Sequence, residues 1–219
     1  MDLFLDTANL DEIRQTVRLG VIRGVTTNPS LAAKEGIGDL REYRRAVQEI
    51  CGIVDGPVSA EVIATELEEM VRQAREIASW APNVVVKLPS TLSGFEAMSV
   101  LSREGLRINQ TLCFSVNQAL LGAHAGATFV SPFVGRLDDE GHDGMQVVGD
   151  IVDVFRRYNI GTKVLAASIR HPLHCVAAAK AGAHIATVPF KVLLQMAHHP
   201  LTDVGVARFA QDWGRVVKV

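Results

Sequence analysis

A lone lysine, Lys87, interrupts the apolar stretch Asn83-Val84-Val85-Val86-Lys87-Leu88-Pro89. β-Branched apolar runs of this length that end at a proline are typical of strands buried on both faces. Burial penalises the ammonium form of a lysine, and the neutral amine that it favours can attack a carbonyl carbon. The alternative is an edge strand whose lysine reaches solvent, and this stretch alone leaves that alternative open.

Two carboxylates, Asp6 and Glu61, also stand at the ends of apolar runs. A lysine nucleophile without a metal cluster or cofactor motif suggests a Schiff base with a ketone or aldehyde, whose iminium form is an electron sink for carbon–carbon bond chemistry. Such chemistry needs a carboxylate that moves a proton at a substrate hydroxyl and a positioned water for the imine steps. Asp6 and Glu61 are the candidates, although Asp6 could instead cap the helix expected from Leu10.

Three further residues, Arg136, Ser168 and Arg170, can make charge-assisted hydrogen bonds to a phosphate. Each also has an ordinary explanation. Arg136 could be a surface charge beside Asp138 and Asp139, and Ser168 could cap a helix.

The elements that must position these residues alternate along the chain. Apolar runs predict strands at Asp2–Asp6, Gly24–Thr27, Val58–Val62, Val84–Leu88, Arg107–Thr111, Phe129–Phe133, Lys163–Ala167 and Ile185–Val188. Amphipathic spacing predicts helices at Leu10–Leu19, Leu40–Ile50, Glu66–Ser79, Phe95–Ser102, Val116–Ala123, Met145–Tyr158, His171–Ala181 and Val192–His198.

This alternation favours a parallel sheet closed into a (β/α)8 TIM barrel, with Thr202–Val217 as an extra C-terminal helix over its outside. A doubly wound open sheet is the alternative, but no GxGxxG turn follows a strand. No linker or low-complexity run divides the chain, so we expect one catalytic domain over residues 1–219.

In a barrel, the C-terminal ends of the strands meet at one face, which is where barrel enzymes carry their chemistry. The residues at or just past the predicted ends are Asp6, Asn28, Glu61, Lys87, Asn109, Thr111, Ser131, Phe133, Arg136, Ser168 and Arg170. Singly they have ordinary roles, such as a turn at Asn28 before Pro29. Together they favour one site, with Ser168 and Arg170 at the seventh strand, where barrel enzymes commonly hold phosphates.

Composition limits the partners. A net charge of −2 argues against nucleic acid or an anionic membrane as the main partner. The three cysteines lack the spacing of a metal site, so no metal is expected.

Residues 108–135 carry no charged side chain, but their Asn, Gln, His and Pro residues favour a buried strand–helix–strand over a membrane span. The N-terminus lacks a signal peptide pattern, and we expect a cytoplasmic protein.

Six segments in order resemble the transaldolase family, in its short bacterial and archaeal branch, and the resemblance runs essentially end to end. They are Asp6-Thr7-Ala8-Asn9, Thr26-Thr27-Asn28-Pro29-Ser30, Val85-Val86-Lys87-Leu88-Pro89, Asn109-Gln110-Thr111-Leu112-Cys113-Phe114-Ser115, Ser131-Pro132-Phe133-Val134-Gly135-Arg136 and Ala167-Ser168-Ile169-Arg170. No one of these segments is decisive, but six in order at the right strand ends are highly specific.

The resemblance implies a reaction without a cofactor. It moves a dihydroxyacetone unit from sedoheptulose 7-phosphate to glyceraldehyde 3-phosphate in the pentose phosphate pathway. Lys87 would form the Schiff base with the ketose C2 carbonyl. Asp6 would be the general base for carbon–carbon cleavage and the acid on the return. Glu61 and Thr111 would hold the water of the imine steps.

The resemblance also implies the binding residues. Asn28 and Asn109 would bind the hydroxyls and amine of the dihydroxyacetone unit, and Ser131 would contact its C1 hydroxyl. The sugar phosphate would be bound by Arg136, Ser168 and Arg170.

Two positions distinguish relatives within the resemblance. The similar fructose-6-phosphate aldolases have Gln at the position of Glu61 and Tyr at that of Phe133, where the hydroxyl helps to release free dihydroxyacetone. Phe133 has no donor, so the resemblance favours transfer, unless Phe133 is only barrel packing. An aldolase and a non-catalytic sugar-phosphate-binding barrel remain alternatives.

The resemblance further implies a homo-oligomer, because short members commonly form rings of five that pair into decamers. In those rings the C-terminal helix reaches a neighbour. The amphipathic end of this chain, Val204 to Val217, is compatible with that arrangement, but a helix docked on its own barrel predicts the same pattern.

Overall fold

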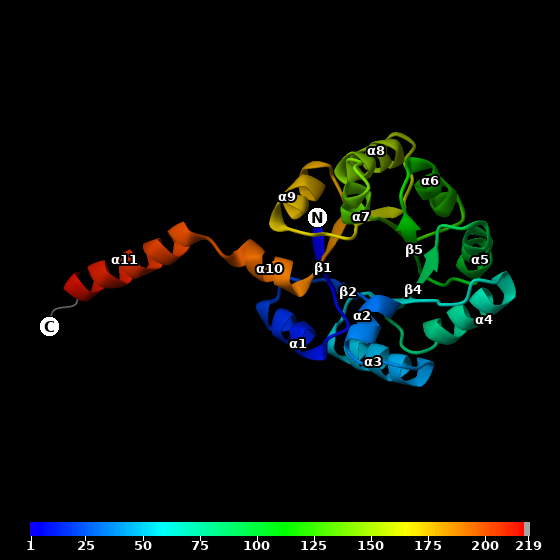
Figure 1. The fold of residues 1–219 in the computed structure, drawn as a ribbon, viewed down its shortest axis with the longest axis horizontal. Coiled ribbons are helices and arrows are strands. Elements are labelled where there is room, and N and C mark those ends of the chain that lie inside the picture. The colour runs from blue at the N-terminus through cyan, green and yellow to red at the C-terminus, as the bar shows by residue number, and fades with distance from the viewer. Residues whose placement is uncertain (217–219) are drawn as a thin grey trace.

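The strands of the protein form one closed barrel. The computed structural model, which describes residues 1–216, contains eight parallel strands paired in the order β1 to β8, with β8 against β1 (Figure 1). The strands are β1 (Asp2–Asp6), β2 (Gly24–Thr26), β3 (Val58–Glu61), β4 (Val84–Pro89), β5 (Ile108–Cys113), β6 (Phe129–Pro132), β7 (Lys163–Ala166) and β8 (Ile185–Val188). The predicted (β/α)8 barrel is confirmed, and the open-sheet alternative is wrong.

Helices follow the strands and surround the barrel (Figure 1). They are α1 (Leu10–Leu19), α2 (Pro29–Lys34), α3 (Leu40–Ile53), α4 (Leu67–Ala78), α5 (Leu92–Arg103), α6 (Val116–His124), α7 (Val134–Asp139), α8 (Gly144–Arg157), α9 (Pro172–Lys180), α10 (Phe190–Ala197) and α11 (Pro200–Val216). The sequence prediction lacks α2 and α7, because six residues are too few to show a helical hydrophobic period. The other predicted bounds agree to within a few residues at each end.

The apolar core has two parts, as the alternation of strand side chains requires. Outward-facing strand residues such as Val86 and Leu88 pack beneath the helices in the larger cluster. A second cluster fills the inside of the barrel and consists of Phe4, Val85, Phe129, Leu165, Ala167 and Ile185. Phe4 and Phe129 meet edge to face there, with ring centroids 6.2 Å apart. This interior core is the floor on which the candidate site lies.

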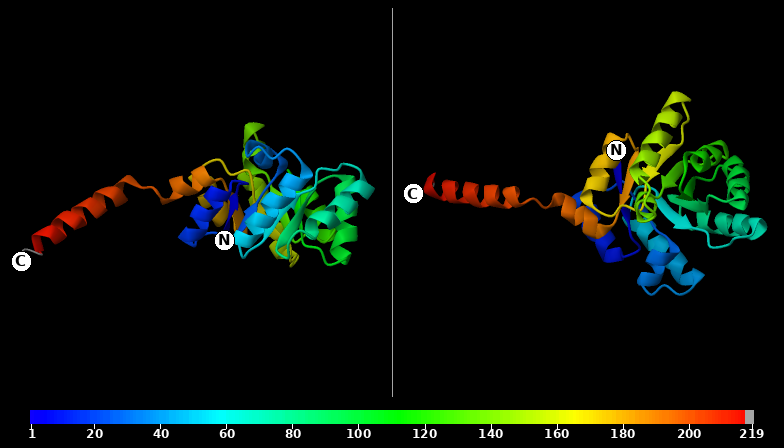
Figure 2. Two further views of the ribbon diagram at one scale, coloured as in Figure 1. Left: turned by 90° about the horizontal axis from the view of Figure 1, so that it is seen from below. Right: turned by 45° about the horizontal axis from the view of Figure 1, so that its top comes forward.

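Helix α11 projects away from the barrel instead of lying over its outside (Figures 1 and 2). None of its residues, Pro200 to Val216, is buried. The expected docking on its own barrel is therefore wrong, because an amphipathic pattern shows that a helix has an apolar face but not which surface covers it. Val217, the predicted last residue of this helix, lies outside the described residues. No helix within residues 1–216 is both long enough and apolar enough to cross a membrane.

Candidate active site

The inside of the barrel changes from apolar to polar toward the C-terminal ends of the strands. In four strands an apolar residue is followed, two positions later, by a polar one: Phe4 and Asp6, Val85 and Lys87, Phe129 and Ser131, Ile185 and Thr187. Residues two apart in a strand point to the same face, so a polar layer stands directly on the apolar floor.

A cavity of about 550 Å³ opens above this layer. Ten of the eleven predicted site residues line it: Asp6, Asn28, Glu61, Lys87, Asn109, Ser131, Phe133, Arg136, Ser168 and Arg170. Thr111 is the exception. The barrel thus brings together side chains from seven strand ends, as the strand-end pattern predicts.

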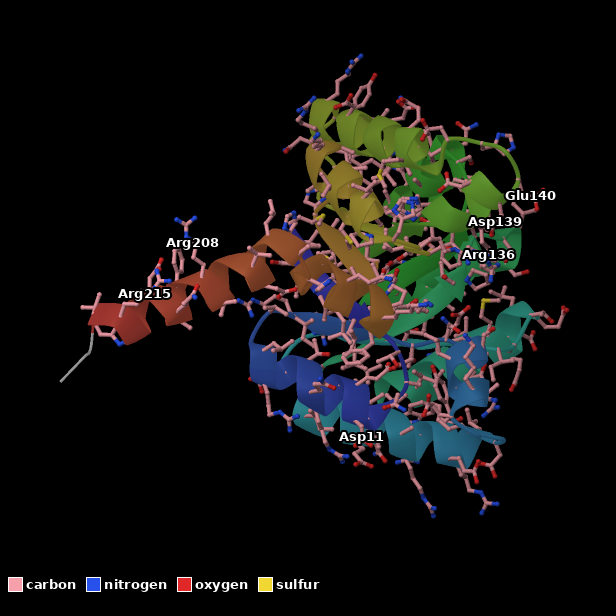
Figure 3. The ribbon with its side chains drawn as sticks, turned by 60° about the vertical axis from the view of Figure 1, so that its left-hand side comes forward. Asp11, Arg136, Asp139, Glu140, Arg208 and Arg215 are labelled. Atoms are coloured by element: carbon pink, nitrogen blue, oxygen red, sulfur yellow. The ribbon has the colours of Figure 1, made fainter. Side chains whose placement is uncertain are left out.

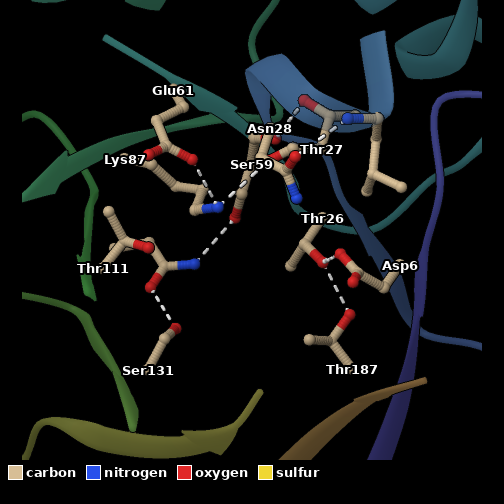
Figure 4. A network of polar contacts seen from close by, with 12 residues as sticks. Asp6, Thr26, Thr27, Asn28, Ser59, Glu61, Lys87, Thr111, Ser131 and Thr187 are labelled. Atoms are coloured by element: carbon tan, nitrogen blue, oxygen red, sulfur yellow. Dashed lines mark hydrogen bonds and ion pairs between the residues drawn. The ribbon is translucent and has the colours of Figure 1, made fainter. Parts of the chain in front are cut away.

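Lys87 is buried at the floor of this cavity, with 4% of the residue exposed. Its Nζ donates hydrogen bonds to Glu61 Oε2 at 2.8 Å and to the Thr27 carbonyl at 3.1 Å (Figure 4). Strand β4 lies between β3 and β5, with Lys87 level with Glu61 and Asn109. The edge-strand alternative for Lys87 is therefore wrong, and its amine is placed where a ligand carbonyl can reach it.

Asp6 lies across the open centre of the barrel from Lys87 (Figure 4). Thr26 Oγ1 donates to Asp6 Oδ1 at 2.7 Å, and the Thr26 and Thr187 hydroxyls lie 2.6 Å apart. Burial raises the pKa of Asp6 above its ordinary value, against the opposing effects of the Thr26 hydrogen bond and the charge of Lys87. A carboxyl group of this kind can exchange a proton with a ligand hydroxyl.

Asp6 does not cap the following helix. The N-cap of α1 is Asn9, whose side chain accepts hydrogen bonds from the amides of Asp11 and Glu12. The capping interpretation of Asp6 is therefore wrong, and its side chain is left to the cavity.

Hydrogen bonds fix the orientation of the Asn109 amide. Its Nδ2 donates to Ser59 Oγ at 3.1 Å, and its Oδ1 accepts from Ser131 Oγ at 2.6 Å (Figure 4). Asn28 Oδ1 accepts from the Leu31 amide at 2.9 Å and caps α2, which leaves its Nδ2 as the group that can reach a ligand. Asn28 thus ends β2, starts α2 and lines the cavity.

Thr111, on β5, lies on the same side of the site as Lys87 and Glu61 (Figure 4), although it does not line the cavity. The residue is fully buried, and within residues 1–216 its hydroxyl has no hydrogen-bond partner. A buried hydroxyl without a partner is costly, so this group is suited to a small polar ligand such as water.

Two exposed arginines, Arg136 and Arg170, stand at the rim of the site. Arg136 lies over the Phe133 ring, with its guanidinium carbon 5.2 Å from the centroid, and Arg170 pairs with Asp139 at 2.8 Å. Arg136 and Asp139 lie on the same side of the molecule (Figure 3). Asp139 pairs with Arg170, and among residues 1–216 Arg136 makes no ion pair, so its guanidinium group can bind an anion.

The backbone of α7 packs closely against the segment after β7. A Cβ atom on Gly135 would lie 2.4 Å from the Ser168 carbonyl oxygen and 2.5 Å from Arg170 Nε. Only glycine allows α7 to approach the segment after β7 so closely. Ser168 itself has a φ of 58°, a left-handed conformation that serine rarely adopts.

The sequence reasoning missed residues that support the site. Thr26 is the hydrogen-bond partner of Asp6, and Thr187 is in turn the partner of Thr26. A signal for Thr187 existed, since it is the single polar residue of strand β8. His174 supports the rim: its Nδ1 accepts from the Arg170 amide at 3.3 Å and its Nε2 lies 3.3 Å from Asp138 Oδ2. Burial lowers the pKa of His174, which favours the neutral ring that this arrangement needs.

Comparison with known proteins gives the family. Residues 3–218 match the sequence profile of the transaldolase/fructose-6-phosphate aldolase family. The chain belongs to this family. It is 63% identical over 219 residues to a probable transaldolase of Dehalococcoides mccartyi and 64% identical over 218 residues to one of Desulforudis audaxviator, with 100% of both chains covered in each case. A probable transaldolase of Heliobacterium modesticaldum is 60% identical over 216 residues, which is 99% of each chain.

Within the transaldolase/fructose-6-phosphate aldolase family, the two distinguishing positions face the same cavity. Glu61 is the ion-pair partner of Lys87, and Phe133 forms a wall of the cavity. Phe133 also packs edge to face on Phe114, with centroids 5.7 Å apart, and on the interior core of the barrel. Phe133 therefore both packs and lines the site.

Proposed function

We propose that this chain is a transaldolase of the pentose phosphate pathway. It transfers a dihydroxyacetone unit from sedoheptulose 7-phosphate, or fructose 6-phosphate, to an aldose phosphate through a Schiff base on Lys87. The observation that carries the proposal is a buried lysine, paired with Glu61, that faces Asp6 across a cavity with two arginines at its rim. Relatives that cover the whole chain at 63% and 64% identity bear the name probable transaldolase.

The first half of the reaction cleaves the donor. The Lys87 amine adds to the C2 carbonyl, and the carbinolamine loses water to give an iminium ion, with Glu61 and Thr111 handling the proton and the water. Asp6 then takes the proton of the C4 hydroxyl. The C3–C4 bond breaks, its electron pair moves to the iminium nitrogen, and an aldose phosphate leaves the enamine behind.

The second half runs in the opposite sense. The enamine attacks the carbonyl carbon of the acceptor, Asp6 returns its proton to the new alkoxide, and water hydrolyses the iminium ion to free Lys87. Asn28, Asn109 and Ser131 hold the dihydroxyacetone unit throughout. Its phosphate-bearing partner is held by Arg136, Ser168 and Arg170, whose donors suit phosphate oxygens.

Phe133 supports transfer over simple cleavage. The cavity wall at this position offers a ring without a proton donor, so the enamine persists until an acceptor arrives. We predict that Phe133→Tyr raises the release of free dihydroxyacetone from fructose 6-phosphate by about tenfold, because one added proton donor is worth roughly 1–2 kcal/mol. Phe114→Tyr is the matched control, since Phe114 touches Phe133 but does not line this cavity.

The test of the function is a coupled assay on the purified protein. Fructose 6-phosphate is supplied with and without erythrose 4-phosphate, and glyceraldehyde 3-phosphate is followed. Product that depends on the acceptor is expected. Equal product in both conditions would identify an aldolase, and ligand-induced thermal stabilisation without turnover would indicate a sugar-phosphate-binding barrel.

The protein is further proposed to be a homo-oligomer, a pentamer or a decamer, held in part by α11. This helix carries Phe209 and Trp213 at 73% and 68% exposure, and a single helix with a bare apolar face is marginal in water. A second copy of the chain can cover that face.

The oligomer is tested by light scattering. We expect a mass five or ten times the 23.7 kDa of one chain. Phe209→Ser with Trp213→Ser should lower that mass, whereas Arg208→Ser, on the polar side of the same helix, should leave it unchanged. A wild-type mass of one chain would refute this part of the proposal.

A further inference from the structure

A buried hydroxyl stands where strands β2 and β3 separate. Tyr43 of helix α3 is 5% exposed, and its ring packs edge to face on Trp80 with centroids 5.7 Å apart. Its hydroxyl lies 2.8 Å from Thr27 Oγ1 and accepts a hydrogen bond from the Glu61 amide at 3.0 Å. Thr27 and Glu61 are also the residues that accept hydrogen bonds from Lys87 Nζ, through the Thr27 carbonyl and the Glu61 carboxylate.

The position of this hydroxyl interrupts a regular ladder. Strands β2 and β3 pair with Val25 opposite Val58 and Thr26 opposite Ser59, and the Thr27 amide still donates to the Ser59 carbonyl at 2.9 Å. In a parallel ladder, the next bond would run from the Glu61 amide to the Thr27 carbonyl. Instead the Glu61 amide donates to Tyr43, and the Thr27 carbonyl accepts from Lys87 Nζ at 3.1 Å.

The hydrogen positions around Tyr43 follow from its partners. Thr27 Oγ1 donates to the Ser59 carbonyl at 2.8 Å, so it must accept from Tyr43. The Tyr43 hydroxyl therefore donates one bond and accepts one. Burial raises its pKa to about 12, which keeps the phenol neutral in this arrangement.

We propose that Tyr43 is a positioning residue for Lys87. By taking the Glu61 amide out of the ladder, its hydroxyl keeps the Thr27 carbonyl open as the second acceptor for the Lys87 amine. Tyr43 also ties down the backbone of Glu61, the first acceptor. This inference rests on the proposed Schiff-base function of Lys87, and Tyr43 itself lies outside the cavity.

The test is Tyr43→Phe, which keeps the ring against Trp80 and removes only the hydroxyl. We expect the ladder bond between Glu61 and Thr27 to close and Lys87 to lose an acceptor. Loss of one such bond should lower kcat by about tenfold and change KM for fructose 6-phosphate by less than about twofold.

Tyr43→Phe should also shift the pH dependence of imine formation at Lys87. A carbonyl acceptor favours the charged amine, so its loss should shift the pH dependence of imine trapping by borohydride to lower pH. The charged groups that share the cavity with Lys87 are Asp6, Glu61, Lys34, Arg136 and Arg170, and the variant leaves all of them in place. A purely structural role for Tyr43 would lower stability without this shift.

The chain provides a matched control, because its only other tyrosine, Tyr158, is 72% exposed. Tyr158→Phe should leave kcat and the pH profile unchanged. In that background, biosynthetic incorporation of 3-fluorotyrosine labels position 43 alone. The more acidic phenol is a weaker acceptor for the Glu61 amide, so the pH dependence of imine trapping should also shift to lower pH, by less than in Tyr43→Phe. This measurement remains possible even if Tyr43→Phe folds poorly.

The outcomes separate the two proposals. Absence of trapping at Lys87 in the wild-type protein would overturn the proposed function. Normal trapping in the wild type, with an unchanged pH profile and kcat in Tyr43→Phe and in the fluorinated protein, would overturn the role of Tyr43.

Discussion

Lys87→Ala is expected to abolish transfer, with kcat/KM lower by roughly 10⁴-fold or more, as is typical when a covalent nucleophile is removed. Lys34 is the other amine among the described residues that line the cavity, but it is exposed on α2, whereas Lys87 is buried at the cavity floor. Borohydride with fructose 6-phosphate should add a ketose-derived mass to the peptide that contains Lys87 in the wild type and to none in the variant.

The same variant should still bind inorganic phosphate, because Arg136 is positioned by Phe133 and Arg170 by Asp139, and the variant leaves both contacts in place. Calorimetric titration of Lys87→Ala with inorganic phosphate measures this binding. Arg170→Ala is the reciprocal variant and should weaken phosphate binding while trapping at Lys87 persists at saturating sugar. Full activity of Lys87→Ala would rule out the Schiff-base mechanism.

Asp6→Asn is expected to lower kcat by about 10²- to 10⁴-fold, the usual contribution of a general acid–base. An amide cannot take the proton of the C4 hydroxyl, so the reaction should stop after the iminium ion forms. Borohydride trapping at Lys87 should therefore survive in this variant. A variant that neither turns over nor traps would assign Asp6 to an earlier step.

Asp6→Asn is also expected to stabilise the fold near neutral pH. Burial raises the pKa of Asp6 in the folded state above its ordinary value of 3.8, so the folded protein binds more protons than the unfolded chain between the two pKa values. The stability of the wild type therefore falls as pH rises through this window. The gain in Asp6→Asn should be full above the folded-state pKa and should shrink as pH falls through it.

Urea unfolding of the wild type and Asp6→Asn across this pH range measures the effect. Asp11→Asn is the control, because the Asp11 side chain is 92% exposed on α1 (Figure 3). A constant difference in the free energy of unfolding between wild type and Asp6→Asn at all pH values would show that the Asp6 carboxyl does not titrate in this range.

Local patterns in the sequence are sufficient to predict the barrel and the strand ends at which the site residues stand. Strand and helix periods are local, so eight alternating units could be recognised without any long-range contact. The alternation of side chains along a strand then explains why Lys87 stands directly above Val85 of the interior core. Residues at strand ends could be grouped because a closed barrel brings those ends together.

The hydrogen-bond partners that hold these side chains depend on long-range packing. Thr26 and Thr187 meet although they lie 161 residues apart, and Tyr43 reaches the β2–β3 gap from a helix. In the sequence, such residues look like ordinary strand threonines or a core aromatic. The same limit applies to α11, whose apolar face is visible in the sequence while the surface that covers it is not. Local patterns report which faces are apolar or polar, but partners distant in the sequence are set by the packing of the whole chain.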